Sequence, residues 1–205
     1  EYLLGTDSVG RDVLSRLIYG ARTSMVVGFI PMLIVVTIGT SVGLIAGFFG
    51  GKVDNLLMRT TDVVYAFPDL LFFIIVLTAL RDTWLGNLFN GLFLLFGALA
   101  IINWTGVARL VRGQVLSLKE KEFVEAARAI GANNTHIMFR HLLPNALSPI
   151  IVSAAFLVPQ AIVTEAILGF IGVGVSPATD PNAPFPTSWG NMLLEGRSLL
   201  LSQPY

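Results

Sequence analysis

The sequence predicts an all-α fold, a polytopic bundle of helices that crosses a membrane several times. The first supporting observation is composition: 54% of the 205 residues are apolar, only 13% are charged, and the mean hydropathy is +0.75. Soluble domains typically carry about 25% charged residues. The second is that long runs of the chain lack charged side chains, and a helix needs about 20 apolar residues to cross the hydrocarbon core of a bilayer.

Four segments are long and apolar enough to be spans. They are residues 24–49, 63–80, 88–110 and 146–175, and the first has no charged residue at all. The last is interrupted by Pro149, Pro159 and Glu165. A helix over all of it would be about 45 Å long, whereas the hydrocarbon core is ~30 Å thick. We therefore expect this segment to tilt, to kink at Pro159 or to end early.

The basic residues indicate which loops face the cytoplasm, because cytoplasmic loops carry an excess of Lys and Arg. Two loops that must share a side hold most of the 13 basic residues. These loops contain Lys52, Arg59, Arg109, Arg112, Lys119, Lys121, Arg128 and Arg140. We expect them to be cytoplasmic, with residues 1–23 and 177–205 outside and residues 24–176 forming the membrane core.

Composition also excludes some functions and gives no sign of others. The formal net charge is zero and there is no cysteine, so nothing indicates nucleic-acid binding, a disulfide framework or thiolate chemistry. The glycines at 47–53 lack the spacing of a phosphate-binding loop, since Ala46 and Val53 occupy two of its required positions. His136 and His141 alone are poor evidence for a metal site. We expect neither a metal nor a cofactor.

The polar segment 109–145 interrupts the apolar pattern between the third and fourth spans. Residues 113–130 are rich in helix formers, and Phe123, Ala127 and Ile130 are expected on one face. Gly131 is a natural C-cap, and residues 133–135 supply oxygens to cap a second short helix, which we expect to stop at Pro144. The segment could be a solvated loop, but its length and internal order favour a docking surface.

This segment resembles the cytoplasmic EAA loop of ABC importer permeases. The matching residues are Glu125, Ala126 and Ala127, then Gly131, then Leu143 and Pro144. His141 departs from the general pattern, which has isoleucine there, but "RHLLPN" at 140–145 is typical of the dipeptide, oligopeptide and nickel branch. Residues 4–24, 61–71, 164–175 and 188–193 resemble further motifs of the C-type permease of that branch. The segment 176–187 lengthens a connection that is short in the family.

The resemblance implies a permease subunit of an ATP-driven importer of dipeptides, oligopeptides or nickel in the cell membrane of a prokaryote. It implies the type I permease fold with six spans in a complete protein, of which four are present here. Expected partners are a homologous second permease, two ABC ATPase subunits that use the ATP, an extracytoplasmic solute-binding protein and membrane lipid. The implied ATPase-coupling residues are Glu125, Ala126, Ala127, Gly131, His141, Leu143 and Pro144.

Polar and small residues within the spans suggest further roles. Asp69, Gln160 and Glu165 are candidates for lining the translocation pathway or for packing, because ionisable groups in a membrane are costly. Gly39, Gly43 and Gly47 recur at a four-residue spacing that permits close helix packing. An alternative is a membrane-embedded enzyme that uses Asp69 or Glu165 as acid or base. These two carboxylates are expected toward opposite membrane faces, which favours the transport subunit.

Overall fold

The structure is a computed structural model that describes residues 2–175 and 185–202. These residues are mostly helical, and the β-pairing among them is the isolated bridge between Thr6 and Asp12. The predicted all-α class is therefore confirmed. The elements in order are α1 (Val13–Phe49), α2 (Gly51–Tyr65), α3 (Asp69–Leu80), α4 (Trp84–Asn87), the 3-10 helix η1 (Leu88–Gly91), α5 (Leu92–Leu118), α6 (Glu122–Ala129), α7 (Asn134–His136), the π-helix η2 (Ile137–Leu142), α8 (Leu143–Phe170) and α9 (Trp189–Ser202).

Three stretches of the described chain are long and apolar enough to cross a membrane as helices: Val13–Phe49, Trp84–Leu118 and Asn134–Phe170. A fourth results only if α2 and α3 are counted as one broken span. The predicted span 63–80 is thus not one helix. The chain breaks at residues 66–68 because Pro68 lacks an amide donor and disfavours helical geometry in the residue before it.

The fourth predicted span is a helix that ends at Phe170, before Val175. The expectation that the preceding short helix stops at Pro144 is wrong, because the helix continues through this residue. The π-helical turn η2 ends at Leu142, two residues before Pro144, and such a turn changes the hydrogen-bonding register. Asn145 Nδ2 also donates to the carbonyl oxygen of His141 at 2.6 Å, which gives that carbonyl a partner. The π-turn thereby accommodates a proline that would otherwise break the helix.

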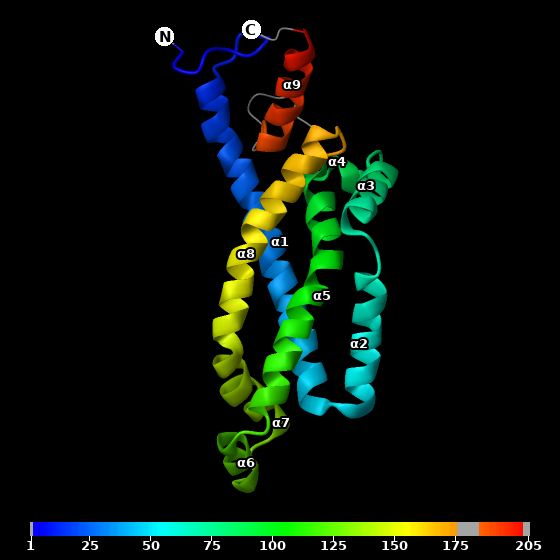
Figure 1. The fold of residues 1–205 in the computed structure, drawn as a ribbon, viewed down its shortest axis with the longest axis vertical. Helices are drawn as coiled ribbons and strands as arrows, with labels where there is room; N and C mark the ends of the chain where they lie inside the picture. Colours follow the sequence, from blue (N-terminus) through cyan, green and yellow to red (C-terminus); the bar gives the residue numbers. More distant parts are fainter. Residues whose placement is uncertain (1, 176–184, 203–205) are drawn as a thin grey trace. The chain divides into compact units, whose positions relative to one another are not determined.

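The chain divides into two compact units. Unit 1 comprises Glu1–Pro31, Asp69–Leu99 and Val158–Tyr205, and unit 2 comprises Met32–Pro68 and Ala100–Leu157. Residues 176–184, which make up most of the predicted insertion, lie outside the described residues. In unit 2, a hydrophobic core joins parts of α1, α5, α6, η2 and α8. Figure 1 shows α6 beyond the ends of α5 and α8 in this unit.

Glycines bring α1 and α5 close together in unit 2. A Cβ atom built on Gly39 would lie 2.6 Å from Val107 Cβ. The corresponding distances are 2.8 Å from Gly43 to Val111 Cβ and 2.8 Å from Gly47 to Val115 Cβ. The glycines of α1 and the valines of α5 that face them both advance by four residues toward the C-terminus, so the two helices run parallel here. The structure therefore places these three glycines in a contact within this chain.

Charged side chains fix the polar end of the same helices. The Arg112 guanidinium donates to both carboxylate oxygens of Asp54 in α2, from Nε to Oδ1 at 2.5 Å and from Nη2 to Oδ2 at 2.7 Å. Lys119 Nζ donates to the carbonyl oxygen of Gly47 at 3.1 Å. Bidentate arginine–carboxylate pairs restrict geometry as well as adding energy. The end of α5, from which α6 follows, is thus held against α1 and α2.

Candidate functional site

The helix α6 is attached to unit 2 by a narrow apolar stripe. Val124 is completely buried and Ala127 is 5% exposed, and both belong to the core that includes Ile137 and Leu142. The predicted apolar face is only partly right, because Ile130 is 86% exposed. Phe123 is also exposed, and of the expected face only Ala127 is buried. The helix turns Val124 and Ala127 toward the core, and Ile130 lies at its C-cap.

The ends of α6 are suited to a short helix. Glu122 and Glu125 lie in its first turn and Arg128 in its last turn. This distribution complements the helix macrodipole, which favours negative charge at the N-terminus and positive charge at the C-terminus. Lys121 occupies the N-cap position without a side-chain capping hydrogen bond. The charges, rather than a side-chain cap, therefore support the start of this helix.

Gly131 terminates α6 in the way that the sequence predicts. Its φ is +82°, in the left-handed region that favours glycine. The Gly131 amide donates to the Arg128 carbonyl at 3.0 Å, and the Ala132 amide donates to the Ala127 carbonyl at 3.0 Å. These two bonds form a Schellman motif. The motif reverses the chain within three residues and leaves the outer face of α6 uncovered.

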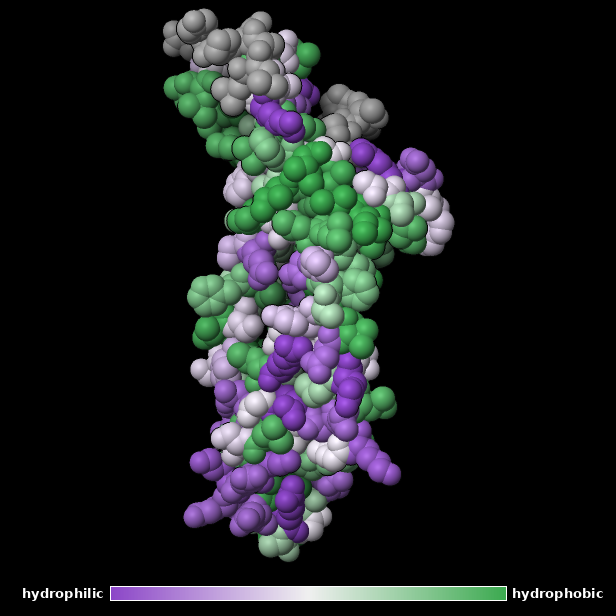
Figure 2. Space-filling model, turned by 45° about the vertical axis from the view of Figure 1, so that its right-hand side comes forward, coloured by the Kyte–Doolittle hydropathy of each residue, from purple (hydrophilic) through white to green (hydrophobic). Residues whose placement is uncertain are grey.

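The outer face of α6 carries two of the seven predicted coupling residues, Glu125 and Ala126, and Gly131 follows the end of this helix. Glu125, Ala126 and Gly131 are exposed, whereas Ala127 is buried. No side chain among the described residues forms a hydrogen bond or ion pair with the Glu125 carboxylate. Figure 2 shows hydrophilic side chains gathered at the end of unit 2 that carries this helix. A short polar helix with a small residue on its exposed face is a suitable surface for close protein contact.

The helix that follows this turn, α7, begins with an N-cap at Asn133. Asn133 Oδ1 accepts a hydrogen bond from the His136 amide at 2.7 Å, as the predicted capping role requires. The His136 and His141 rings lie 5.5 Å apart between centroids, and Phe123 of α6 lies 6.4 Å from His141. His141 therefore connects α6 with the base of α8. Among the other predicted coupling residues, Leu143 is half-buried and Pro144 is exposed.

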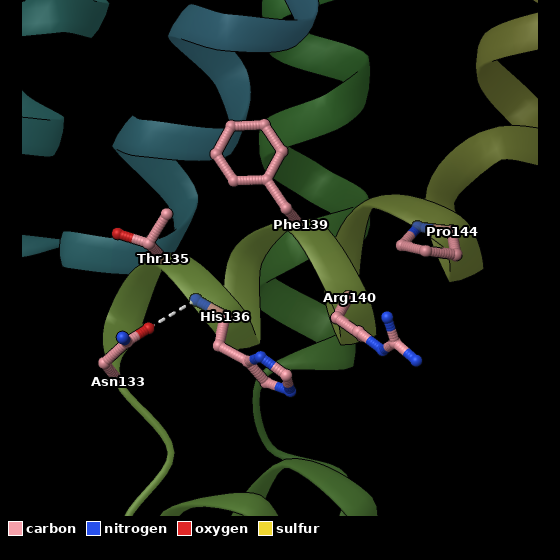
Figure 3. A pocket seen from close by; sticks show the side chains of 6 residues that line it. All are labelled: Asn133, Thr135, His136, Phe139, Arg140 and Pro144. Carbon is pink, nitrogen blue, oxygen red and sulfur yellow. Dashed lines mark hydrogen bonds between the residues drawn. The ribbon is translucent and has the colours of Figure 1, made fainter.

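A pocket of about 730 Å³ lies on this second helical stretch (Figure 3). Its lining residues are Asn133, Thr135, His136, Phe139, Arg140 and Pro144. Of these residues, only Pro144 is expected from the sequence to belong to a site. The four-residue spacing of His136, Arg140 and Pro144 places these residues on one helix face, and this spacing could have indicated the pocket. Figure 3 shows the Phe139 ring directed away from the His136 and Arg140 side chains.

The membrane carboxylates are located in unit 1. Glu165 is completely buried, and its Oε1 accepts a hydrogen bond from Ser188 Oγ at 2.6 Å. Asp69 is exposed at the start of α3, and Gln160 is exposed on α8. The two carboxylates thus share a unit, and their expected location toward opposite membrane faces stays a prediction. No hydrogen bond or ion pair between described residues joins them, and this gives the enzyme alternative no support.

The start of the chain is held to α9 by charges in unit 1. Arg16 forms ion pairs with Asp7, at 2.7 Å, and with Glu195. Burial opposes ionisation of Asp7, but hydrogen bonds from the Arg11 amide and side chain and from the Val9 amide outweigh it. The pKa of Asp7 is consequently lowered to about 2. Residues 2–12 therefore have a defined, charge-stabilised attachment.

Comparisons with known proteins point to one family. Residues 39–192 match the family described as "Binding-protein-dependent transport system inner membrane component". The dipeptide transport system permease protein DppC of Alkalihalophilus pseudofirmus is 42% identical over 205 residues, which is 100% of this chain and 62% of that protein. The oligopeptide transport system permease protein OppC of Bacillus subtilis is 38% identical over 205 residues, with the same coverage of 100% and 62%.

Two further similarities agree with this family. The glutathione transport system permease protein GsiD of Pectobacterium atrosepticum is 39% identical over 202 residues, covering 98% of this chain and 62% of that protein. The chain thus spans less than two thirds of the length of these relatives. A solved structure described as an amino acid ABC transporter with histidines has a TM-score of 0.58 at 19% identity, covering 94% of this chain and 78% of that one. At this identity the structural likeness supports the fold alone.

Proposed function

Because the chain belongs to the family of binding-protein-dependent transport system inner membrane components, we propose that it is a transmembrane permease subunit of an ATP-driven peptide importer. Family membership and the apolar helices make the chain a multi-pass protein of the cell membrane. The proposed solute class rests on its relatives, which are named for transport of dipeptides, oligopeptides and glutathione.

The observation that carries this proposal is the exposed helix α6 with its Schellman turn. An importer needs a place where the motion of an ATPase reaches the membrane helices. Helix α6 is attached by Val124 and Ala127 while Glu125 and Ala126 remain exposed. Its attachment includes the base of α8, because Ile137 and Leu142 belong to the same core. A force on α6 would therefore act on a membrane-spanning helix.

In the proposed mechanism, ATP closes two separate ATPase subunits, and their movement displaces α6. A homologous second permease completes the pathway, and a solute-binding protein delivers the peptide from outside. A docked ATPase shifts the permease between inward-open and outward-open states only if its contacts with α6 differ between them. The chain itself binds no nucleotide in this scheme. The small side chain of Ala126 allows close approach, and Glu125 offers an acceptor to a partner.

The test uses the full-length protein expressed with its candidate partner permease and ATPases. The complex is purified through a tag on this chain, reconstituted with the solute-binding protein, and assayed for ATP-driven uptake of a labelled dipeptide. Ala126→Trp should abolish uptake without preventing membrane insertion, because its side chain is exposed and would obstruct docking. Ala126→Ser is the matched control, since it preserves a small side chain and should preserve uptake.

The outcomes separate the parts of the proposal. Co-purification of ATPases with the wild type, and their loss with Ala126→Trp, would support coupling through α6. Wild-type uptake by Ala126→Trp would refute it. Absence of any ATPase from a folded, inserted complex would refute the permease assignment itself. Uptake of Ni²⁺ without uptake of any peptide would refute the proposed solute class and leave the coupling role intact.

A further inference from the structure

Two adjoining cavities of unit 2 have complementary chemistry. The first, called here the basic pocket, is the pocket of about 730 Å³ that contains Asn133, His136 and Arg140. The second, called here the apolar groove, has a volume of about 470 Å³ and lies between α1 and the stretch formed by η2 and α8. Phe139 lines both cavities. We propose that together they bind one anionic phospholipid, with its phosphate in the basic pocket and an acyl chain in the apolar groove.

The basic pocket presents hydrogen-bond donors and no carboxylate. The Arg140 guanidinium is exposed and forms no hydrogen bond or ion pair with any described residue. Asn133 uses its side-chain oxygen to accept from the His136 amide at 2.7 Å (Figure 3), and this bond orients its NH₂ group as a donor to an anionic ligand. Arginine binds phosphate well because its planar guanidinium offers two parallel donors. The pocket is therefore suited to a phosphate oxygen.

The apolar groove is suited to a hydrocarbon chain. Leu44 and Ile45 of α1 form one side, and Leu147 and Ile150 of α8 form the other. Three hydroxyl groups of α1 also line it, those of Thr37, Thr40 and Ser41. Thr37 donates to the Leu33 carbonyl at 2.7 Å and Ser41 to the Thr37 carbonyl at 2.8 Å, whereas Thr40 Oγ1 is buried without a hydrogen-bond partner among the described residues. The methyl and methylene groups of these side chains can contact an acyl chain.

The length of the groove corresponds to one leaflet of a bilayer. Residues 139 to 150 cover about 16 Å of helix at about 1.5 Å per residue. Half of a hydrocarbon core of ~30 Å is about 15 Å. Phe139, which is 58% exposed, lies at the polar end of this path. Because Phe139 lines both cavities, it would mark the level at which the headgroup ends and the acyl chain begins.

Charge distinguishes a lipid from a transmembrane helix as the occupant. An apolar helix from another subunit would cover Leu147 and Ile45, but it would leave Arg140 and the Asn133 amide without an anion. A phospholipid places a negative charge at the head of the same molecule that fills the groove. Electrostatic attraction to an anionic headgroup and burial of apolar area then act together. The proposal goes beyond the proposed function, because neither the solute nor the ATPase enters it.

The experiment measures lipid retained by the full-length protein in its complex. Complexes in neutral detergent are titrated with dioctanoyl phosphatidylglycerol, dioctanoyl phosphatidylcholine or inorganic phosphate, and bound molecules are counted by native mass spectrometry. Wild type should retain one phosphatidylglycerol per chain and bind phosphatidylcholine more weakly. Arg140→Gln should weaken phosphatidylglycerol binding by about tenfold or more, since it removes a hydrogen bond to a charged group. Arg140→Lys should restore part of this loss.

Two further variants locate the binding site. Leu147→Trp fills the apolar groove and should abolish phosphatidylglycerol binding while the basic pocket is left intact. Arg59→Gln is the matched control, because it removes one exposed positive charge of unit 2 outside both cavities. It should leave lipid binding unchanged. The readout needs no transport, so loss of uptake in the earlier test would not affect it.

Several results would overturn the proposal. Equal loss of lipid in Arg59→Gln and Arg140→Gln would mean a diffuse charge effect instead of a site. Binding of inorganic phosphate that persists in Leu147→Trp, without retained lipid, would indicate a site for free phosphate. A photo-crosslinker at position 147 that captures the second permease in place of phosphatidylglycerol would show that a protein helix fills the groove.

Discussion

Replacing Gly131 with alanine should raise the population of molecules in which α6 is detached from the core of unit 2, while the membrane helices stay folded. Gly131 has a φ of +82°, and a Cβ atom built on it would meet nothing within 4 Å. Steric clash with neighbours therefore contributes nothing, and the cost comes from the left-handed backbone alone, about 1–2 kcal/mol. Escape from this conformation would break the two Schellman bonds from the Gly131 and Ala132 amides.

This cost is large compared with what holds α6 in place. The helix has eight residues, fewer than the ~12 that an isolated helix needs for even marginal stability. Its packing depends mainly on Val124 and Ala127, and full burial of a valine stabilises by about 1.5–3 kcal/mol. Each 1.4 kcal/mol corresponds to about a tenfold change in population. The detached population should therefore rise about 5- to 30-fold.

Hydrogen exchange in the reconstituted full-length protein measures this population directly. The amides of residues 124–132 should exchange faster in Gly131→Ala by the same 5- to 30-fold, and ATP-driven uptake should fall. The exchange rates in Gly131→Asn should lie between those of wild type and Gly131→Ala, because asparagine tolerates the left-handed region better than alanine does. Gly113→Ala is the matched control: Gly113 is exposed on α5 with nothing within 4 Å of an added Cβ. Gly113→Ala should stabilise the folded protein by up to about 1 kcal/mol, because alanine is favoured over glycine inside a helix. Unchanged exchange in Gly131→Ala would refute the reasoning.

Three further outcomes are expected in the full-length protein. Gly39→Ala should destabilise the protein by about 1–3 kcal/mol through overpacking against α5, which would appear as a lower Tm. Gly106→Ala should not lower the Tm, because a Cβ atom built on Gly106 meets nothing within 4 Å. Equal Tm values for the two variants would contradict this packing. Glu165→Ala should cost about 1–3 kcal/mol of stability, because the Ser188 O–H loses the acceptor to which it donates. Glu165→Gln keeps an acceptor oxygen and should cost less. Equal losses by thermal unfolding would exclude the hydrogen bond as the cause. Because the pKa of Asp7 is lowered from 3.8 to about 2, its stabilisation of residues 2–12 is complete above about pH 4 and lost as the pH falls toward 2. Pepsin cleavage of this segment, normalised to an unfolded substrate at each pH, should rise over that range in wild type but not in Asp7→Asn.

Local chemistry explains which structural expectations are confirmed. Gly131 adopts a positive φ and Asn133 caps the next helix, because these roles depend on a residue and its immediate neighbours. Pro144 shows the limit of such reasoning. A proline normally ends a helix, but the π-turn before it shifts the hydrogen-bonding register and the helix continues. No local rule in the sequence places a π-turn at residues 137–142.

Side-chain environments were the least predictable part of the site. Ile130 is expected on an apolar face with Ala127 but is 86% exposed, because α6 turns Val124 and Ala127 toward the core and Ile130 lies at its C-cap. The four-residue spacing of His136, Arg140 and Pro144 indicates a shared helix face, but spacing does not show that this face borders a pocket. The glycine spacing of α1 indicated close packing, but the sequence could not identify α5 as the neighbour.

The sequence by itself therefore determined the class of protein, the approximate membrane segments, the family motifs and the turn at Gly131. Hydropathy and backbone preference act within one segment, so they can be read along the chain. Only the tertiary structure decided that Gly39, Gly43 and Gly47 face Val107, Val111 and Val115, that Glu165 binds Ser188, and that α6 exposes Glu125 and Ala126. These arrangements depend on how helices distant in sequence pack, and packing is set by the fit of both surfaces together.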